Sequence, residues 1–554
     1  MKIAIYIPFI LFWASSLLAQ NTVGLISHDL GKTQAGYNLI FPHGQSNTYL
    51  LNNCGEIAHV WIDSIYRPGN SVFLSEDGLL YRAGGRGAAS NTYINAGGGG
   101  EVLEIRDWDN NVLWRWAYND STVRLHHDFV VTPDETILAI AWERKSGAEA
   151  VAAGRNPTRL PDGEVWPDHI IEVEPIGFDS ANIIWEWHAW DHLIQDFDST
   201  KANYGDPAQR PELIDINWGS DAADWHHMNA IDYDDFKDQI VLSVPTFNEV
   251  WIIDHSTSTS DAAGHTGGFS GKGGDLVFRW GNPAAYRQGD STDQKLFFQH
   301  DIHWIDLGLS NSDPNFGKLM VFNNRAAVDH STVHIIAPTF DEYDWSYGKS
   351  GATFLPENFD WTYKRPDSTS LYSTGLSGAQ RLKNGNTLIC SGRHGYAFEI
   401  TDTEEIVWEY KVPLNSGNVV SQGAVLPINA NILFRMDRYP ADYLAFTGKD
   451  LSSKGFIELN PNTAFCDLTT DIGDLKTEST EVLFYPNPTN DQFRVEPSKN
   501  LHGSNLMAFD LLGNLVMKPR WVSQKGTDVD VSNWAPGMYL IVLDSHQVGK
   551  LLVY

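Results

Sequence analysis

The sequence is poor in cysteine, poor in positive charge, and has no long hydrophobic run beyond its N-terminus. Its three cysteines, Cys54, Cys390 and Cys466, form no Cys-x-x-Cys pair, which disfavours a zinc site built from thiolates. An oxidising compartment permits one disulfide. Cys54 and Cys466 would join the start of the main domain to its end, although the sequence alone leaves this pairing open.

Charge and composition restrict the class of partner. The 554 residues carry 39 basic and 70 acidic side chains, a formal net charge of −31. Such a surface repels nucleic acid and anionic lipid, so we expect no nucleic acid partner. An anionic ligand would need a local positive pocket. A hydrophobic content of 42% and 20 tryptophans supply large cores and argue against a disordered chain.

The N-terminus has the features of an export signal. Residues 1–19 contain Lys2, an apolar run and small residues that end at Ala19, which predicts a secretory signal peptide. A single uncleaved membrane anchor is the alternative interpretation. No later stretch is long enough to span a bilayer. We therefore expect no transmembrane segment after the signal peptide, and a secreted or cell-surface protein.

Residues 20–465 contain a repeated pattern. An apolar strand, a turn and a strand ending in an aromatic residue occur as GEVLEIRDWDNNVLWRW at 100–116 and YAFEITDTEEIVWEY at 396–410. A second hairpin follows each copy, as in GAQRLKNGNTLICSG at 378–392 and GAVLPINANILFRMD at 423–437. Two hairpins make four strands, and six such units predict an all-β fold, a six-bladed β-propeller. An array of β-sandwiches is the competing architecture.

Propeller geometry would gather basic side chains from several units at one channel, because equivalent strand ends converge on the axis. The candidates are His127, His227, Asn229, His300, Arg325, Arg393, His394 and Arg435. Three kinds of site compete: a metal centre, a passive funnel for an anion, and an imidazole nucleophile that acts on an anionic group. The arginines would repel a divalent cation, so we expect no metal at this position.

The C-terminal segment has a pattern of its own. Residues 466–482 are polar and aperiodic, which is typical of a linker. Residues 483–554 predict a small Ig-like β-sandwich, and a carbohydrate-binding or adhesive module is one interpretation. The arrangement of YPNPT, DLLGN and GMYLIVL resembles the C-terminal sorting domain of the type IX secretion system. That resemblance implies export across an outer membrane, with the secretion machinery as a partner.

The longer motifs of the main domain resemble the bacterial arylsulfotransferase family. They are DWHHMNAIDYD, FFQHDIHWI, GKLMVFNNR, GAQRLKNGNTLICSGRHGYAFEI and ILFRMDRYPADYLAFTGKDL, and they keep the family's order over most of residues 90–460. The resemblance implies a six-bladed propeller that transfers a sulfuryl group from an aryl sulfate donor to a phenolic acceptor through a sulfohistidine. It implies no cofactor and no nucleotide sulfate donor.

The resemblance also implies which residues act on the substrate. The WxHxN pattern falls on His227 and Asn229, and the adjacent His226 leaves the choice of histidine open. The QH pattern gives His300, with His303 as its substitute. The two imidazoles are expected to hold a sulfate oxygen and to protonate the departing phenolate.

Arginines and a third histidine complete the implied site. Arg325 is expected to clamp two sulfate oxygens, and His394 is the implied nucleophile. We expect Arg393 and Arg325 to lower the pKa of His394 and keep it neutral. His127, Arg393 and Arg435 are expected to bind substrate, together with Asn229. The long insertion at 255–275 departs from the family's pattern.

Two other functions compete. A sulfatase would use water in place of the phenol, but Cys390 begins CSGRH and lacks the proline of a CxPxR-type formylglycine motif. A non-catalytic secreted propeller would bind an anionic ligand or a surface glycan, since propellers host many unrelated functions. Such a scaffold needs no convergence of His and Arg from four units.

Overall fold

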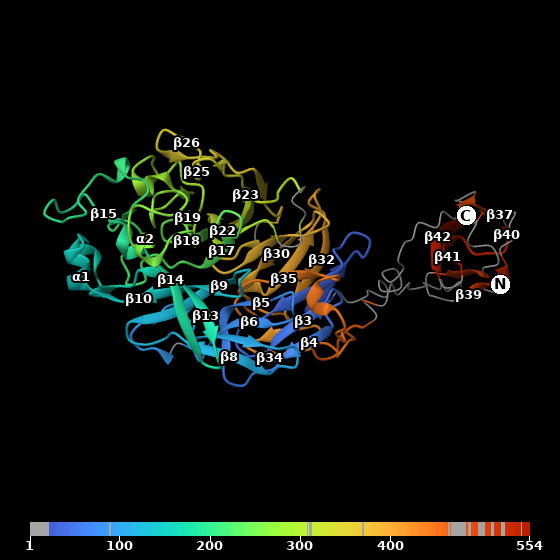
Figure 1. Ribbon diagram of the computed structural model, residues 1–554. Coiled ribbons are helices and arrows are strands. Elements are labelled where there is room, and N and C mark those ends of the chain that lie inside the picture. Colours follow the sequence, from blue (N-terminus) through green and yellow to red (C-terminus); the bar gives the residue numbers. More distant parts are fainter. Residues whose placement is uncertain are drawn as a thin grey trace, which may run out of the picture. The chain divides into compact units, whose positions relative to one another are not determined.

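Strands make up nearly all of the regular secondary structure in the described part of the chain, which confirms the all-β prediction (Figure 1). The computed structural model describes residues 21–87, 90–306, 309, 313–367, 371–463, 466, 483–485, 489–496, 505–510, 515–521, 527–543 and 546–553. The predicted signal peptide and nearly all of the predicted linker lie outside these residues. The chain forms two compact units, Met1–Asn462 and Thr463–Tyr554.

Six antiparallel sheets of four or more strands lie in the described part of the first unit. Their first strands are β5 (Arg67–Leu74), β9 (Val123–Val131), β17 (Ala230–Asp234), β21 (His300–Trp304), β29 (Gly378–Arg381) and β35 (Asp437–Pro440). The second strands, in the same order of sheets, are β6 (Leu80–Gly85), β10 (Ile137–Glu143), β18 (Gln239–Val244), β22 (Leu319–Ala327), β30 (Thr387–Ser391) and β2 (Gly36–Ile40).

The outer strands of these sheets follow the same order. The third strands are β7 (Val102–Arg106), β13 (Asp168–Ile176), β19 (Glu249–Asp254), β23 (His330–Ile336), β31 (Tyr396–Ile400) and β3 (Thr48–Asn52). The fourth strands are β8 (Val112–Ala117), β14 (Ser180–His188), β20 (Phe278–Trp280), β28 (Trp361–Tyr363), β32 (Ile406–Lys411) and β4 (Ile57–Trp61). A fifth strand, β1 (Gly24–His28), pairs with β32.

The first strands contact one another in a closed order. β5 contacts β9, β9 contacts β17, β17 contacts β21, and β21 contacts β29. Gln380 of β29 donates to the Arg438 carbonyl of β35 at 3.1 Å, and Leu74 N of β5 donates to Tyr439 Oη of β35 at 2.9 Å. This arrangement is consistent with the predicted β-propeller.

Tryptophans in five of the six fourth strands connect their sheet to the next. Their indole N–H groups donate to backbone carbonyls in or near the following sheet, which gives the aromatic residue at the end of these hairpins a structural role. The hydrogen bonds, 2.6–3.0 Å long, run from Trp61 to Asp107, Trp114 to Ser180, Trp187 to Gly274, Trp280 to Pro356 and Trp408 to Asn53.

The predicted hairpin at 423–437 is wrong. Among the described residues, this segment contributes only the start of β35, at Asp437. Its backbone instead bonds to the turn after β30: Asn429 N donates to the Arg393 carbonyl at 2.8 Å, and Leu433 N donates to the Gly392 carbonyl at 2.9 Å. The segment therefore packs beside a turn that the sequence had singled out, at Arg393 and His394.

Short helices and two-stranded ribbons fill the connections. The helices are α1 (Gly147–Ala152), α2 (Thr259–Ala262), η2 (Pro157–Arg159), η3 (Ala189–His192), η4 (Pro207–Gln209), η5 (Pro283–Tyr286), η6 (Gly392–His394) and η7 (Leu444–Phe446). The ribbons pair β11 (Lys145–Ser146) with β12 (Glu164–Val165), β15 (Leu193–Ile194) with β16 (Ile214–Asp215), β24 (Phe340–Asp341) with β25 (Ser346–Tyr347), β26 (Lys349–Ser350) with β27 (Thr353–Phe354), and β33 (Leu414–Asn415) with β34 (Asn418–Val419).

The second unit contains two antiparallel sheets in its described residues. One consists of β36 (Leu483–Tyr485), β37 (Gln492–Glu496) and β40 (Thr527–Asp530). The other consists of β39 (Leu515–Trp521), β38 (Asn505–Asp510), β41 (Gly537–Leu543) and β42 (His546–Val553). Val495 and Val529 of the first sheet share a buried cluster with Ala508 and Ile541 of the second. The described helices include none that is long and apolar enough to cross a bilayer.

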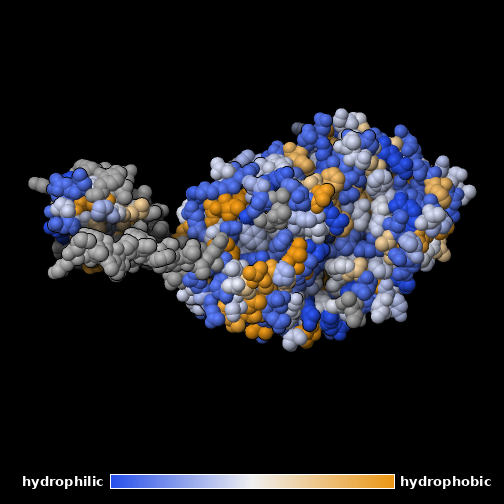
Figure 2. Space-filling view, turned by 180° about the vertical axis from the view of Figure 1, so that it is seen from behind, coloured by the Kyte–Doolittle hydropathy of each residue, from blue (hydrophilic) through white to orange (hydrophobic). Residues whose placement is uncertain are grey.

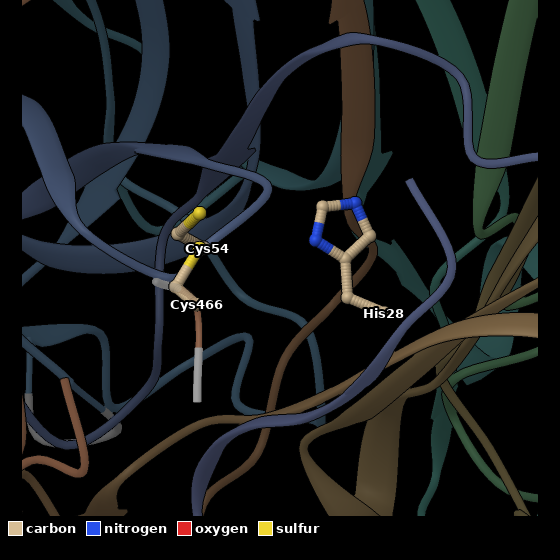
Figure 3. Close-up of side chains that lie close together, drawn as sticks. All are labelled: His28, Cys54 and Cys466. Carbon is tan, nitrogen blue, oxygen red and sulfur yellow. The ribbon is translucent and has the colours of Figure 1, made fainter. Parts of the chain in front are cut away.

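Cys54 and Cys466 are both disulfide-bonded, whereas Cys390 is free and buried. With three cysteines in the chain, the two bonded residues pair with each other. Figure 3 shows their sulfur atoms side by side, with His28 nearby. This settles the pairing that the sequence left open. Figure 2 shows a largely hydrophilic face with scattered hydrophobic areas, as the excess of acidic residues leads one to expect.

Candidate active site

Residues in or just before five of the first strands adopt left-handed backbone conformations. They are Asn70, His127, His227, Phe298 and Ser377, with φ of 94°, 53°, 55°, 57° and 85°. This region costs a non-glycine residue about 1–3 kcal/mol and persists where the surroundings impose it. Because the strands concerned contact one another, the strained positions mark one end of the ring as a candidate site.

His127, His227 and His300 lie together at this end. The ring centroids of His127 and His227 are 4.6 Å apart, at an interplanar angle of 76°. The Phe298 ring lies 6.2 Å from His227 and 6.2 Å from His300. β9, the segment just before β17, and the first residue of β21 therefore each contribute one imidazole to a single group, which we call the three-histidine cluster.

His227 is held by a carboxylate that sits three residues before it. Its Nδ1 donates to Asp224 Oδ2 at 2.5 Å, and Trp142 Nε1 donates to Asp224 Oδ1 at 3.0 Å. Burial lowers the pKa of His227, but the charge and hydrogen bond of Asp224 outweigh it and raise the pKa above the ordinary histidine value. Asp224 therefore favours the imidazolium form of His227, in which Nε2–H is a donor.

His300 is held in the opposite protonation state. Both amide hydrogens of Asn324 bond to carbonyls, those of Ser373 and Leu376, each at 2.8 Å. Asn324 Oδ1 therefore faces His300 Nδ1, at 2.8 Å, and accepts its hydrogen. Burial lowers the pKa of His300 to about 3. A neutral imidazole with its hydrogen on Nδ1 has an unprotonated Nε2, which is the form a nucleophile needs.

His127 is neutral and rests on a buried second layer. Burial, with the charge of His227, holds the pKa of His127 well below its usual range. Its Nδ1 lies 2.8 Å from His126 Nδ1, and His126 Nε2 lies 2.6 Å from Asp168 Oδ1. The His126 ring stacks on Trp142 at 3.8 Å, which holds this layer in place.

Two arginines border the cluster. The Arg325 guanidinium lies over the Phe298 ring, 3.8 Å from its centroid. A Cβ built on Gly375 would lie 3.3 Å from Arg393 Nη2 and 3.7 Å from His300 Cε1, so Arg393 and His300 flank the same glycine. Arg393 Nε is buried and has no hydrogen-bond partner among the described residues, which leaves a charged donor for a ligand.

His394 points to different neighbours. It lies one residue beyond Arg393 in η6, and its Nδ1 lies 2.9 Å from Ser391 Oγ. Burial lowers the pKa of His394, and the charge of Lys411 adds to the effect. The direction is the expected one, but its causes are burial and Lys411 rather than Arg393 and Arg325. No described contact joins His394 to the three-histidine cluster.

Asn229 and Arg435 make hydrogen bonds to residues next to those of the cluster, and Asn229 Oδ1 is buried without a partner among the described residues. Asn229 is fully buried, and its Nδ2 donates to the Gln299 carbonyl, next to His300, at 2.8 Å. Arg435 Nη1 donates to Asp128 Oδ2 at 2.8 Å and lies 3.5 Å from Asp301 Oδ1. Both residues therefore position the strands that carry the histidines.

The structure also separates the adjacent histidines. His226 is fully buried and packs on Trp225, with ring centroids 3.9 Å apart, whereas His227 belongs to the cluster. His303 lines a separate cavity of about 160 Å³ together with Asp301, Asp437 and Arg435, and the Arg435 guanidinium faces both carboxylates. His227 and His300 are thus the members of each pair that meet at the cluster.

Beside Phe298 and Arg325, the surface is hollowed. The hollow has a volume of about 380 Å³ and is lined on its other sides by Pro245, Thr246 and Phe297. An aromatic ring, a guanidinium and apolar side chains around one hollow suit a ligand with an aromatic body and an anionic end.

Sequence reasoning missed the residues that set the protonation states. Asp224 lies within the DWHH motif, three residues before His227, and its spacing was a usable signal. Asn324 lies next to Arg325 in FNNR, but its role depends on the carbonyls of Ser373 and Leu376, which no local pattern reveals. The left-handed conformations had no signal in the sequence.

The fold and site define an all-β protein with a cationic site at one end of a ring of sheets. A family model described as Arylsulfotransferase (ASST) matches residues 45–422, and a model described as Secretion system C-terminal sorting domain matches residues 483–553. The first match spans more than half of the chain, which therefore belongs to the arylsulfotransferase family. The sorting domain indicates export by type IX secretion, to the cell surface or beyond it.

Comparisons with individual proteins add little. The search of curated proteins gives no match. Among solved structures, the chain is similar to a protein of unknown function from Bacteroides caccae, at 11% identity and a TM-score of 0.36 over 68% of this chain and 94% of that one. It is also similar to a streptogramin B lyase, at 10% identity and a TM-score of 0.30 over 64% and 73%. Likeness at this level carries no argument.

Proposed function

We propose that this protein is an exported aryl-sulfate sulfotransferase that works through a sulfohistidine, with the six sheets as propeller blades and an Ig-like sorting domain at its C-terminus. The observation that carries the proposal is the pair of neighbouring imidazoles with different partners: His227 faces the Asp224 carboxylate, and His300 faces the Asn324 amide oxygen. Titratable groups pushed apart in this way are typical of an acid and a nucleophile that act at one substrate.

The donor's sulfate group binds between the cations. Arg325 and Arg393 supply planar guanidinium donors for its oxygens, and the Nε2–H of His227 supplies a third. The aryl ring occupies the hollow beside Phe298. This local positive charge overcomes the net charge of −31, which opposes the approach of any anion.

Transfer then proceeds in two displacements. The Nε2 lone pair of His300 attacks sulfur, the bond from sulfur to the aryl oxygen breaks, and its electron pair leaves with the phenolate, which takes the proton from His227. The acceptor phenol next returns its proton to His227 as its oxygen attacks sulfur, and the nitrogen–sulfur bond breaks to restore His300. Fixed positive charge stabilises both loose transition states, as in phosphoryl transfer.

This proposal moves the nucleophile from the predicted His394 to His300. His394 is also neutral, but it contacts Ser391 and lies outside the cluster. His300 lies beside Arg393, and the rings of both His300 and the proposed acid, His227, lie 6.2 Å from that of Phe298. His394 follows Arg393 directly in the sequence, so replacing His394 is a control at a neighbouring position outside the cluster.

A transfer assay with a chromogenic phenyl sulfate and a second phenol tests the function. We expect His300→Asn to lower kcat/KM by at least about a thousandfold and His394→Asn to lower it by less than about tenfold. The reverse order would contradict the assignment of His300. Release of sulfate without any phenol acceptor would indicate the hydrolytic alternative, and no turnover of any aryl sulfate would favour the non-catalytic one.

A further inference from the structure

A second group of convergent side chains lies in the insertion at 255–275, outside the three-histidine cluster. His265 and Asp275 belong to this insertion, and His192 ends η3. His192 Nδ1 lies 2.8 Å and His265 Nδ1 lies 2.7 Å from the same atom, Asp275 Oδ1. One carboxylate oxygen thus faces two imidazole nitrogens.

The surroundings of His192 fix its tautomer. Its Nε2 lies 2.9 Å from the carbonyl oxygen of Ala262, which only accepts, so Nε2 carries a hydrogen. In a neutral imidazole, Nδ1 then has a lone pair, and this lone pair faces Asp275 Oδ1. Two acceptors at 2.8 Å repel each other unless a cation, either a proton or a metal ion, lies between them.

The group is built in the way that a metal site is built. His192 is fully buried and stacks on Trp187 at 5.7 Å, and its second nitrogen bonds to a carbonyl, as metal-bound histidines typically do. A Cβ on Gly274 would lie 2.6 Å from His192 Nε2 and 2.0 Å from the Ala262 oxygen, so only glycine lets Asp275 approach. The His265 side chain is 53% exposed, which leaves one side of the group to water.

We propose that His192, His265 and Asp275 bind one zinc ion, with water as the fourth ligand. Two imidazoles and a carboxylate suit zinc. Ligand atoms at about 2.0–2.1 Å from a tetrahedral zinc lie about 3.3 Å apart, so binding moves the exposed His265 outward and also widens the buried His192–Asp275 pair, each by about half an ångström. The ion fastens the insertion to η3. The trio in Figure 3 is different, because the sulfur atoms of Cys54 and Cys466 are bonded to each other.

Zinc titration of the purified, EDTA-treated full chain tests the proposal. Wild type is expected to bind one equivalent of Zn²⁺ and to show a higher unfolding midpoint with the metal. His265→Ala and Asp275→Asn should bind it at least about tenfold more weakly and lose the shift. His330→Ala is the matched control, because His330 also contacts an aspartate, Asp329, without a second histidine ligand.

The outcomes distinguish a zinc ion from a proton between His192 and Asp275. If wild type binds no stoichiometric zinc, a proton occupies the position, and the group is a buried imidazolium–carboxylate pair. Equal zinc affinity of wild type, His265→Ala and Asp275→Asn would also overturn the site. His265 is half exposed, so its replacement leaves the core intact, and circular dichroism checks that the variant is folded.

Discussion

His227 and His300 are the same kind of side chain, yet their surroundings drive their pKa values in opposite directions. The difference lies in one neighbour each: a carboxylate for His227 and an amide oxygen for His300. A carboxylate stabilises the imidazolium, whereas a neutral amide cannot offset the loss of solvation. In the proposed mechanism, these two hydrogen-bond partners distinguish the acid from the nucleophile.

Replacing Asp224 with Asn should shift the alkaline limb of the pH–rate profile to lower pH. The reaction needs His227 protonated, so the rate falls as pH rises through its pKa, which Asp224 raises. Without the carboxylate, the pKa falls and the limb moves with it. The alkaline limb is measured from the pH dependence of kcat/KM for the aryl sulfate donor, and circular dichroism confirms that the variant is folded.

An unmoved limb in Asp224→Asn, at whatever rate, would show that another group controls the alkaline side. The acidic side of the pH–rate profile is an internal control, because it should be the same in wild type and variant. His300 has a pKa of about 3, so it stays neutral and competent at every pH above that value in both proteins.

At the scale of elements, the repeated hairpins are joined by hydrogen bonds from fourth-strand tryptophans. This link was visible in the sequence, because each strand–turn–strand pattern ends in an aromatic residue. The same periodicity predicted the four-stranded sheets. It failed at 423–437, where apolar residues alternate but the backbone bonds to the turn at 392–393 instead of forming a hairpin.

Replacing Trp114 with Phe should lower the free energy of unfolding by about 0.5–1.5 kcal/mol, because the hydrogen bond from the indole to the Ser180 carbonyl would be lost. Trp116→Phe is the matched control. Trp116 lies on the same strand and face, is less buried, and makes no described indole hydrogen bond. If chemical denaturation shows the same loss of unfolding free energy in both variants, the size of the ring and not its hydrogen bond is responsible.

The site was less predictable than the sheets. The motifs pointed to His127, His227, His300, Arg325 and Arg393, whose side chains lie in or beside the three-histidine cluster, and their roles stay predictions. The motifs also pointed to His394, which follows Arg393 directly in the sequence. Adjacent residues of a turn point in different directions, and the pattern alone does not say which of them faces the neighbouring sheet.

At the scale of the whole molecule, strand pairing and a disulfide connect segments that lie far apart in the sequence. β35 pairs with β2, and β1 pairs with β32, so the two ends of the first unit share two sheets. The bond between Cys54 and Cys466 closes a long loop of chain, which restricts the unfolded state.

Replacing both Cys54 and Cys466 with Ser should lower the free energy of unfolding by about 2–4 kcal/mol. A reductant should destabilise wild type by a similar amount and leave the double variant unchanged, which makes it a control for the substitutions themselves. Identical unfolding curves of wild type with and without reductant would contradict a stabilising role for this bond.

The proposed transfer mechanism requires His300 to receive the sulfuryl group. The most direct measurement is rapid quenching of the enzyme with a phenyl sulfate and no acceptor, followed by peptide mass spectrometry under alkaline conditions. We predict a mass increase of one SO₃ group on the peptide that contains His300, and its removal when a phenol is added. The same label on His394, with His300 unmodified, would contradict the account.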